Sequence, residues 1–244
     1  MKRVIYVITE NTPLTKNVFR MKLFGDTSDI TAPGQFVNIL VDGFFLRRPI
    51  SVCDRAEDGF TIIYKVVGRG TAKMSTMREG QTLDVLTGLG NGYDLAPSEN
   101  SPLLIGGGVG VPPLYWLAKE LVSQGKNVSI ILGFNTSDEI FYEDEFLRLG
   151  AKVTVTTVDG SKGVKGFVTD AMGGNYTYFY ACGPEPMLKA VYKKSSTSGQ
   201  LSFERRMGCG FGACMGCSCK TIAGAKRICK DGPVLTKEEI LWED

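Results

Sequence analysis

Residues 103–121, LLIGGGVGVPPLYWLAKEL, decide the architecture of this 244-residue chain. A short apolar run enters a glycine-rich turn, and apolar residues then recur at helical spacing. Pro112 and Pro113 fit a first helical turn, where their missing N–H groups cost nothing. Further strands are predicted at 128–133, 153–158 and 176–181, and helices at 143–149 and from 186. This alternation of strands and helices predicts a parallel sheet of βαβ units.

The first hundred residues follow a different rhythm. Runs rich in β-branched and aromatic residues occupy 4–8, 18–23, 36–41 and 61–67, and turn signals lie between them. Short strands at this spacing, without a long amphipathic helix, predict a small antiparallel β-barrel or sandwich. Residues 195–200 are expected to form a linker to a cysteine-rich tail. The predicted units are therefore 1–98, 99–198 and 199–244.

Charge and composition exclude several classes of function. With 28 Lys and Arg against 26 Asp and Glu, the net charge of +2 offers no footprint for nucleic acid or an anionic membrane. Glycines and prolines interrupt the most apolar stretch, so we expect no segment that spans a bilayer. We expect a cytoplasmic location. Histidine is absent, which excludes Ser-His-Asp triads, His-ligated zinc and Rieske clusters.

Five of the seven cysteines crowd into residues 209–229. The spacing Cys209-x4-Cys214-x2-Cys217-x11-Cys229 is typical of plant-type [2Fe–2S] ferredoxins, in which four thiolates hold two irons. Glycines around them allow a tight loop that turns backbone N–H groups toward the sulfurs. Zinc is the alternative, although structural zinc sites usually present two C-x2-C knuckles. Cys219 is expected to be a packing or exposed thiol outside the ligand set.

Two glycine-rich turns predict a dinucleotide site. The GGGVG turn follows one predicted strand, and residues 181–187, ACGPEPM, follow another strand about 75 residues later. A turn of this kind places phosphate against backbone N–H groups at a helix N-terminus. One such turn is common in α/β proteins, but two at the carboxyl ends of parallel strands can face one dinucleotide.

A third set of motifs lies in the predicted barrel: RRPIS at 47–51, IYK at 63–65 and GRGT at 68–71. An arginine beside a strand can fork onto a pyrophosphate, and a serine can hydrogen-bond a flavin edge. Taken alone, the same residues are better explained as a surface arginine pair on a β-barrel.

In sequence order, RPxS, GxGT, GGGxGxxP and CGPxPM resemble the ferredoxin–NADP reductase superfamily, in which a barrel binds flavin and a Rossmann-like domain binds the nicotinamide dinucleotide. RMGCGFGAC and KRICKDGPV narrow the resemblance to electron-transfer subunits of NAD-dependent (class 1B) dihydroorotate dehydrogenases. The resemblance implies FAD contacts at Arg48, Pro49, Ile50, Ser51, Ile63, Tyr64, Lys65, Gly70 and Thr71. It implies a nicotinamide site framed by Gly107, Gly108, Gly110, Pro112, Gly183 and Pro184, with Cys182 beside the nicotinamide. For Cys182 an inert thiol at the strand end is the alternative. It implies cluster ligation by Cys209, Cys214, Cys217 and Cys229.

The same resemblance implies a role in pyrimidine biosynthesis. A catalytic subunit with FMN would oxidise dihydroorotate, and this chain would pass its electrons through the [2Fe–2S] cluster and FAD to NAD⁺. The implied assembly is a heterotetramer with two copies of each subunit. Met207, Phe211 and Met215 in the cluster loop are candidate contacts with that partner, and packing within the cluster domain is an equal alternative for each of them.

Three features leave alternatives open. Ile50 stands where many superfamily members carry the tyrosine of RxYS, so the stacking partner of the flavin is undetermined. Residues 134–139, FNTSDE, offer acids and no arginine, which predicts NAD over NADP. Rival functions are a subunit of a ferredoxin–NADP transhydrogenase or sulfide dehydrogenase, or a non-enzymatic iron–sulfur carrier. The paired dinucleotide turns argue against the carrier.

Overall fold

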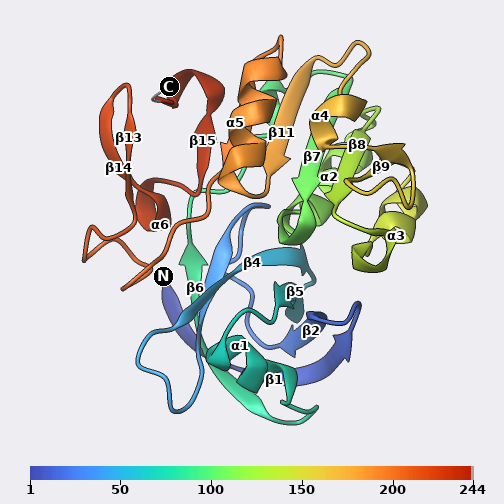
Figure 1. Cartoon of the computed structure of the whole chain (residues 1–244). Coiled ribbons are helices and arrows are strands. Elements are labelled where there is room, and N and C mark those ends of the chain that lie inside the picture. The colour runs from blue at the N-terminus through green and yellow to red at the C-terminus, as the bar shows by residue number, and fades with distance from the viewer. Residues whose placement is uncertain (243–244) are drawn as a thin grey trace.

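The computed structural model describes residues 1–242, and its N-terminal part, residues 2–89, is a closed antiparallel barrel with the strand order β1-β2-β5-β4-β3-β6 (Figure 1). Its elements are β1 (Lys2–Pro13), β2 (Val18–Phe24), β3 (Phe36–Leu40), β4 (Arg48–Arg55), β5 (Gly59–Lys65), α1 (Arg69–Ser75) and β6 (Thr82–Leu89). The predicted antiparallel barrel is confirmed. The sequence analysis missed β4 and β6, and β4 is the strand that carries the RPIS motif.

Alternating apolar side chains from the strands fill the barrel. Tyr6, Met21, Ile39 and Ile62 are buried there, and the Tyr6 ring meets Phe60 edge-on at 4.9 Å between ring centroids. Period-two alternation directs one face of each strand into this core. The barrel core therefore leaves the outer face and the strand ends available for ligands.

The part of the chain from residue 102 to residue 236 is built on a seven-stranded sheet with the order β10-β9-β8-β7-β11-β12-β15. Its strands are β7 (Pro102–Gly107), β8 (Ser129–Phe134), β9 (Lys152–Thr157), β10 (Val164–Lys165), β11 (Tyr178–Cys182), β12 (Gly199–Ser202) and β15 (Val234–Thr236). Its helices are α2 (Pro113–Ser123), α3 (Glu143–Arg148), α4 (Val168–Ala171) and α5 (Glu185–Lys194), with 3-10 turns at Ala96–Ser98, Gly108–Gly110, Ser137–Glu139 and Lys237–Glu239. All pairings except β12 with β15 are parallel, which confirms the predicted βαβ sheet.

The expected linker at 195–200 is wrong, because Gly199 and Gln200 begin β12, which pairs in parallel with β11. The polar side chain of Gln200, at the end of this stretch, is hydrogen-bonded inside the fold. Gln200 Nε2 donates to the Asp94 carbonyl at 2.8 Å, and the Asp94 N–H donates to Gln200 Oε1 at 2.9 Å. A buried amide with these partners is as acceptable in a strand as an apolar residue.

The cysteine-rich segment holds a hairpin of β13 (Ser218–Thr221) and β14 (Gly224–Arg227), followed by α6 (Ile228–Asp231). It stands beside the other units in Figure 1, and its chain returns to the sheet as β15. Asn91, between the barrel and the sheet, anchors it: Nδ2 donates to the Val234 carbonyl at 2.8 Å, and the backbone N–H donates to Gly232 at 2.7 Å. Residues 243–244 of the predicted third unit lie outside the described residues. Within 1–242, we find no helix with the length and apolarity needed to cross a membrane.

Two of these units share a packed interface. Helix α2 of the sheet lies against β4 of the barrel: Trp116 is buried in the barrel core, and Lys119 pairs with Asp54 at 3.0 Å. Ile63 of β5 packs into the core of the sheet unit. The ends of the barrel strands are thereby held next to the carboxyl ends of the parallel strands.

Candidate redox site

The RPIS and GRGT motifs meet on the barrel. The Arg48 guanidinium lies 4.9 Å from the centroid of the Phe44 ring and against Gly70, where a Cβ would collide with it. Thr71 Oγ1 accepts from the Val67 N–H at 3.0 Å and donates to the Gly68 carbonyl at 3.1 Å, so this hydroxyl shapes the turn. The arrangement presents a cationic group beside an open backbone turn, which suits a pyrophosphate.

The predicted flavin contacts do not all face the same way. The Tyr64 ring is buried in the barrel core, where its hydroxyl donates to Asn11 Oδ1 at 2.9 Å and burial raises its pKa to about 12. The Ile63 side chain is buried between the two units. Residues 48–51 and Lys65 are half-buried, so their side chains remain accessible. At Ile63 and Tyr64 only the backbone could contact a ligand beside Arg48.

The two glycine-rich turns lie side by side, since β7 and β11 are neighbours in register with Cys182 opposite Gly106. A Cβ at Gly110 would collide with the Cys182 carbonyl, so only glycine permits this approach. Gly108 has a φ of +52°, and the space where its Cβ would stand is open. Pro112 caps α2, and Gly183 and Pro184 lead into α5. The structure thus brings the predicted nicotinamide residues together at the strand ends.

Cys182 is the last residue of β11 and lies beside these two turns. Burial raises the pKa of its thiol to about 12, although a hydrogen bond with Ser202 acts in the opposite direction. A thiol with such a pKa stays protonated at neutral pH and is a poor nucleophile. Its chemistry is that of a neutral, polarisable side chain.

The four predicted cluster ligands lie in the loop before β13 and in α6, and they form two pairs. The backbone N–H groups of Ala213 and Cys214 donate to Cys209 Sγ at 3.2 and 3.4 Å, and the Cys229 N–H donates to Cys217 Sγ at 3.4 Å. Burial acts to raise the pKa of Cys209, but backbone hydrogen bonds lower it to about 6. Among residues 1–242, no three Cys, His, Asp or Glu side chains are arranged to hold a single metal ion. Two thiol pairs with N–H donors fit a two-iron cluster.

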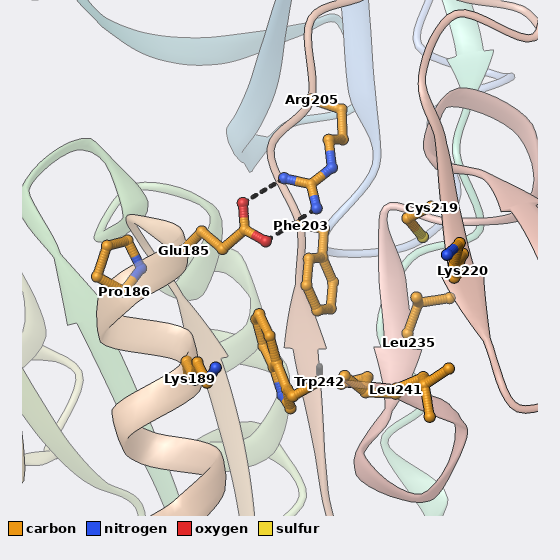
Figure 2. Close-up of a pocket in the computed structure, with 11 residues that line it drawn as sticks. Glu185, Pro186, Lys189, Phe203, Arg205, Cys219, Lys220, Leu235, Leu241 and Trp242 are labelled. Carbon is orange, nitrogen blue, oxygen red and sulfur yellow. Dashed lines mark hydrogen bonds and ion pairs between the residues drawn. The ribbon is translucent and has the colours of Figure 1, made fainter. Parts of the chain in front are cut away.

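Cys219 lies apart, on the wall of a cavity of about 590 Å³ between α5 and the hairpin (Figure 2). Glu185 of α5 and Arg205 form an ion pair with two hydrogen bonds at the rim of the cavity, and Phe203 and Trp242 line the cavity. Burial raises the pKa of the Cys219 thiol. Its position is consistent with the expectation that Cys219 is not a ligand.

One residue of the site escaped the sequence analysis. Asn38 of β3 is 1% exposed, and its Nδ2 donates to the Cys209 carbonyl at 3.2 Å. Gly210 has a φ of +77° and rests directly on the Asn38 amide, leaving no room for a side chain. The signal was present as the polar residue in the apolar run FVNIL, residues 36–40.

Comparison with known proteins identifies the family of the chain. Residues 204–241 match the family model described as the iron-sulfur cluster binding domain of dihydroorotate dehydrogenase B, and residues 104–193 match an oxidoreductase NAD-binding domain. The chain is 45% identical to the dihydroorotate dehydrogenase B (NAD(+)) electron transfer subunit of Fusobacterium nucleatum subsp. nucleatum, over 96% of each chain. It is 43% identical to that of a Geobacillus species, over 99% of each. The chain belongs to this family of electron transfer subunits.

Solved structures share the fold of this chain. A chain of the NADH-dependent reduced ferredoxin–NADP oxidoreductase superposes with a TM-score of 0.89 at 33% identity, covering 98% of this chain and 90% of that one. A ferredoxin NADP⁺ reductase from Neisseria gonorrhoeae, at 17% identity and a TM-score of 0.68, covers 80% of this chain and 90% of that one and shares the fold. The predicted fold class, family and cofactor classes ([2Fe–2S], FAD and NAD) are confirmed. As an electron transfer subunit, the chain has a catalytic partner.

Proposed function

We propose that this chain carries electrons from an FMN-containing dihydroorotate dehydrogenase catalytic subunit to NAD⁺ in pyrimidine biosynthesis. The contact between the cluster loop and the flavin barrel carries the proposal. Asn38 bonds the backbone of Cys209 and pairs across the sheet with Pro49 of the RPIS strand. When bound, the cluster moves single electrons, FAD converts between single electrons and a hydride, and NAD⁺ accepts the hydride.

The residues of this chain hold and orient those groups. FAD would be held by Arg48, Pro49, Ile50, Ser51, Lys65, Gly70 and Thr71, with the backbone of Ile63 and Tyr64. The nicotinamide dinucleotide would be held by Gly107, Gly108, Gly110, Pro112, Gly183 and Pro184. The cluster would be ligated by Cys209, Cys214, Cys217 and Cys229.

Cys182 is proposed as the side chain beside the nicotinamide. A hydride transfer needs alignment and a dry contact, and it needs no general base. The protonated Cys182 thiol and the close approach of Gly110 to its carbonyl supply a neutral wall without a competing nucleophile. The absence of histidine from the sequence is therefore compatible with the reaction.

We also propose how the work is divided along the chain. Residues 1–98 bind FAD, 99–198 bind NAD and 199–244 bind the cluster, while β12 and β15 of the last unit complete the sheet of the second. The assembly is a heterotetramer with two copies of each subunit. A reducing cytoplasmic setting suits a chain in which none of the seven cysteines forms a disulfide.

The isolated, anaerobically purified chain tests the proposal. We expect about one FAD, two irons and two labile sulfides per chain, NADH oxidation with artificial acceptors, and no dihydroorotate turnover. Addition of the catalytic subunit should restore electron transfer from dihydroorotate to NAD⁺. Dihydroorotate turnover by this chain alone would contradict the division of labour.

The similarity to the ferredoxin–NADP oxidoreductase chain supports a second candidate, a subunit of a ferredoxin-dependent complex. In that case the chain should couple to reduced ferredoxin and fail to couple to dihydroorotate when each partner is supplied in turn.

A further inference from the structure

The loop between β3 and β4, residues 41–47, exposes apolar side chains at its tip although it is firmly anchored. Phe45 is 98% exposed, and Leu46 next to it is 45% exposed. Isolated apolar residues on a surface are common, but a fully exposed phenylalanine on an ordered loop gains nothing for the fold of its own chain.

Bonds on both sides of Phe45 fix the loop. Arg47 donates to the Asn38 and Asp84 carbonyls at 3.2 and 3.0 Å and pairs with the Asp84 carboxylate at 2.8 Å. On the other side, Lys73 Nζ donates to the Asp42 carbonyl at 2.8 Å. The tip is therefore held in place, and little conformational entropy would be lost if a partner covered it.

The same loop is joined to the cluster loop through a single residue. Asn38 accepts from Arg47 at its carbonyl and donates to the Cys209 carbonyl through its side chain. The cluster loop also exposes apolar side chains, with Phe211 at 43% and Met215 at 53%, whereas Met207 packs against the protein core. Both loops project from the left side of the molecule in Figure 1. We refer to the exposed apolar side chains of these two linked loops, Phe45, Leu46, Phe211 and Met215, as the tip surface.

We propose that the tip surface is the docking site of the catalytic subunit and that Phe45 is its anchor. This inference rests on the proposed function. A protein that exchanges electrons with the cluster must approach the cluster loop closely. Phe45 and Leu46 lie on a loop that Arg47 ties to β3, and Asn38 of β3 is hydrogen-bonded to the cluster loop. Large aromatic side chains at the centre of an interface dominate its affinity. The barrel therefore contributes to partner binding alongside the cluster loop.

The test measures the affinity of the full chain, loaded with FAD and cluster, for the separately purified FMN-containing catalytic subunit. Phe45→Asp should raise Kd by about thirtyfold or more, and Phe45→Ala by about tenfold, as for an aromatic anchor. Phe167→Asp is the matched control, because Phe167 is 65% exposed just before α4 on the sheet unit. It should bind like the wild type. All three variants should keep the FAD content, the cluster spectrum and the NADH–acceptor activity of the wild type.

Each other outcome overturns the inference. Wild-type affinity in both Phe45 variants would show that the partner docks elsewhere. Loss of FAD from Phe45→Ala would assign the loop to the flavin site, and loss of self-association by the isolated chain would assign the tip surface to a second copy. If the wild-type chain itself fails to bind the catalytic subunit, the proposed function fails, and the Phe45 inference fails with it.

Discussion

Replacing Asn38 by alanine tests whether the cluster loop owes its position to the barrel. The Asn38 side chain is 1% exposed and bonds the Cys209 carbonyl at 3.2 Å. A hydrogen bond of this kind contributes about 1 kcal/mol net. Asn38 Oδ1 has no partner within the described residues, so its removal breaks no further bond. Asn38→Ala should therefore destabilise the docked loop by about 1 kcal/mol, which raises the undocked population about fivefold.

Asn38→Asp should have a larger effect. It keeps the size of the side chain but sets a carboxylate against the Cys209 carbonyl in a buried position. An unpaired buried charge costs several kcal/mol, so this variant should lose the cluster or bind it weakly.

The assay is the rate of cluster loss to an iron chelator, followed by visible absorbance, together with the EPR spectrum of the reduced cluster. Loss should be about fivefold faster for Asn38→Ala if the undocked loop is the reactive form. Exposed Asn100, just before β7, provides the matched control Asn100→Ala, which should behave as wild type. NADH–acceptor activity should not change in any variant. Equal rates of cluster loss for wild type and both Asn38 variants would refute the reasoning.

Three further predictions concern the cluster, the nucleotide and the acid limit of stability. Cys217→Ala should abolish cluster iron while Cys219→Ala retains it, as measured by iron and labile sulfide content; loss of iron in the second variant would place Cys219 among the ligands. Asp138→Arg, in the exposed acidic loop after β8, should raise the NADPH/NADH ratio of kcat/KM by about tenfold or more, and an unchanged ratio would remove this loop from nucleotide recognition. Burial acts to raise the pKa of Glu10, but bonds from Lys22 and other neighbours lower it from 4.5 to about 2. The contribution of this carboxylate to the free energy of unfolding is thus complete above pH 4.5 and is lost as pH falls toward 2. In Glu10→Gln the acid-dependent loss of unfolding free energy should be smaller than in the wild type by about 2 kcal/mol, allowing for partial exposure. Equal acid unfolding curves for the wild type and Glu10→Gln would contradict this prediction.

Local patterns in the sequence were sufficient to predict the fold class, the iron–sulfur cluster and the dinucleotide site, whereas FAD followed from the family resemblance. The spacing from Cys209 to Cys229 predicts a cluster because the ligands of a tight loop are close in the chain. The glycine-rich turns predict a parallel sheet with a dinucleotide site because strand, turn and helix are consecutive. In each case the interacting groups lie within a few residues of one another, so sequence distance stands for spatial distance.

The tertiary structure alone decided which side chains face the sites. Tyr64 lies in a predicted flavin motif, yet the closure of the barrel turns its ring into the core and its hydroxyl to Asn11. Gln200 sits in a polar stretch, yet its pairing beside β11 makes it part of a strand. Asn38 reaches a residue 171 positions away, and no local pattern encodes such a contact. Side chains alternate across a strand, so the direction of each depends on the register with partners that are distant in the chain.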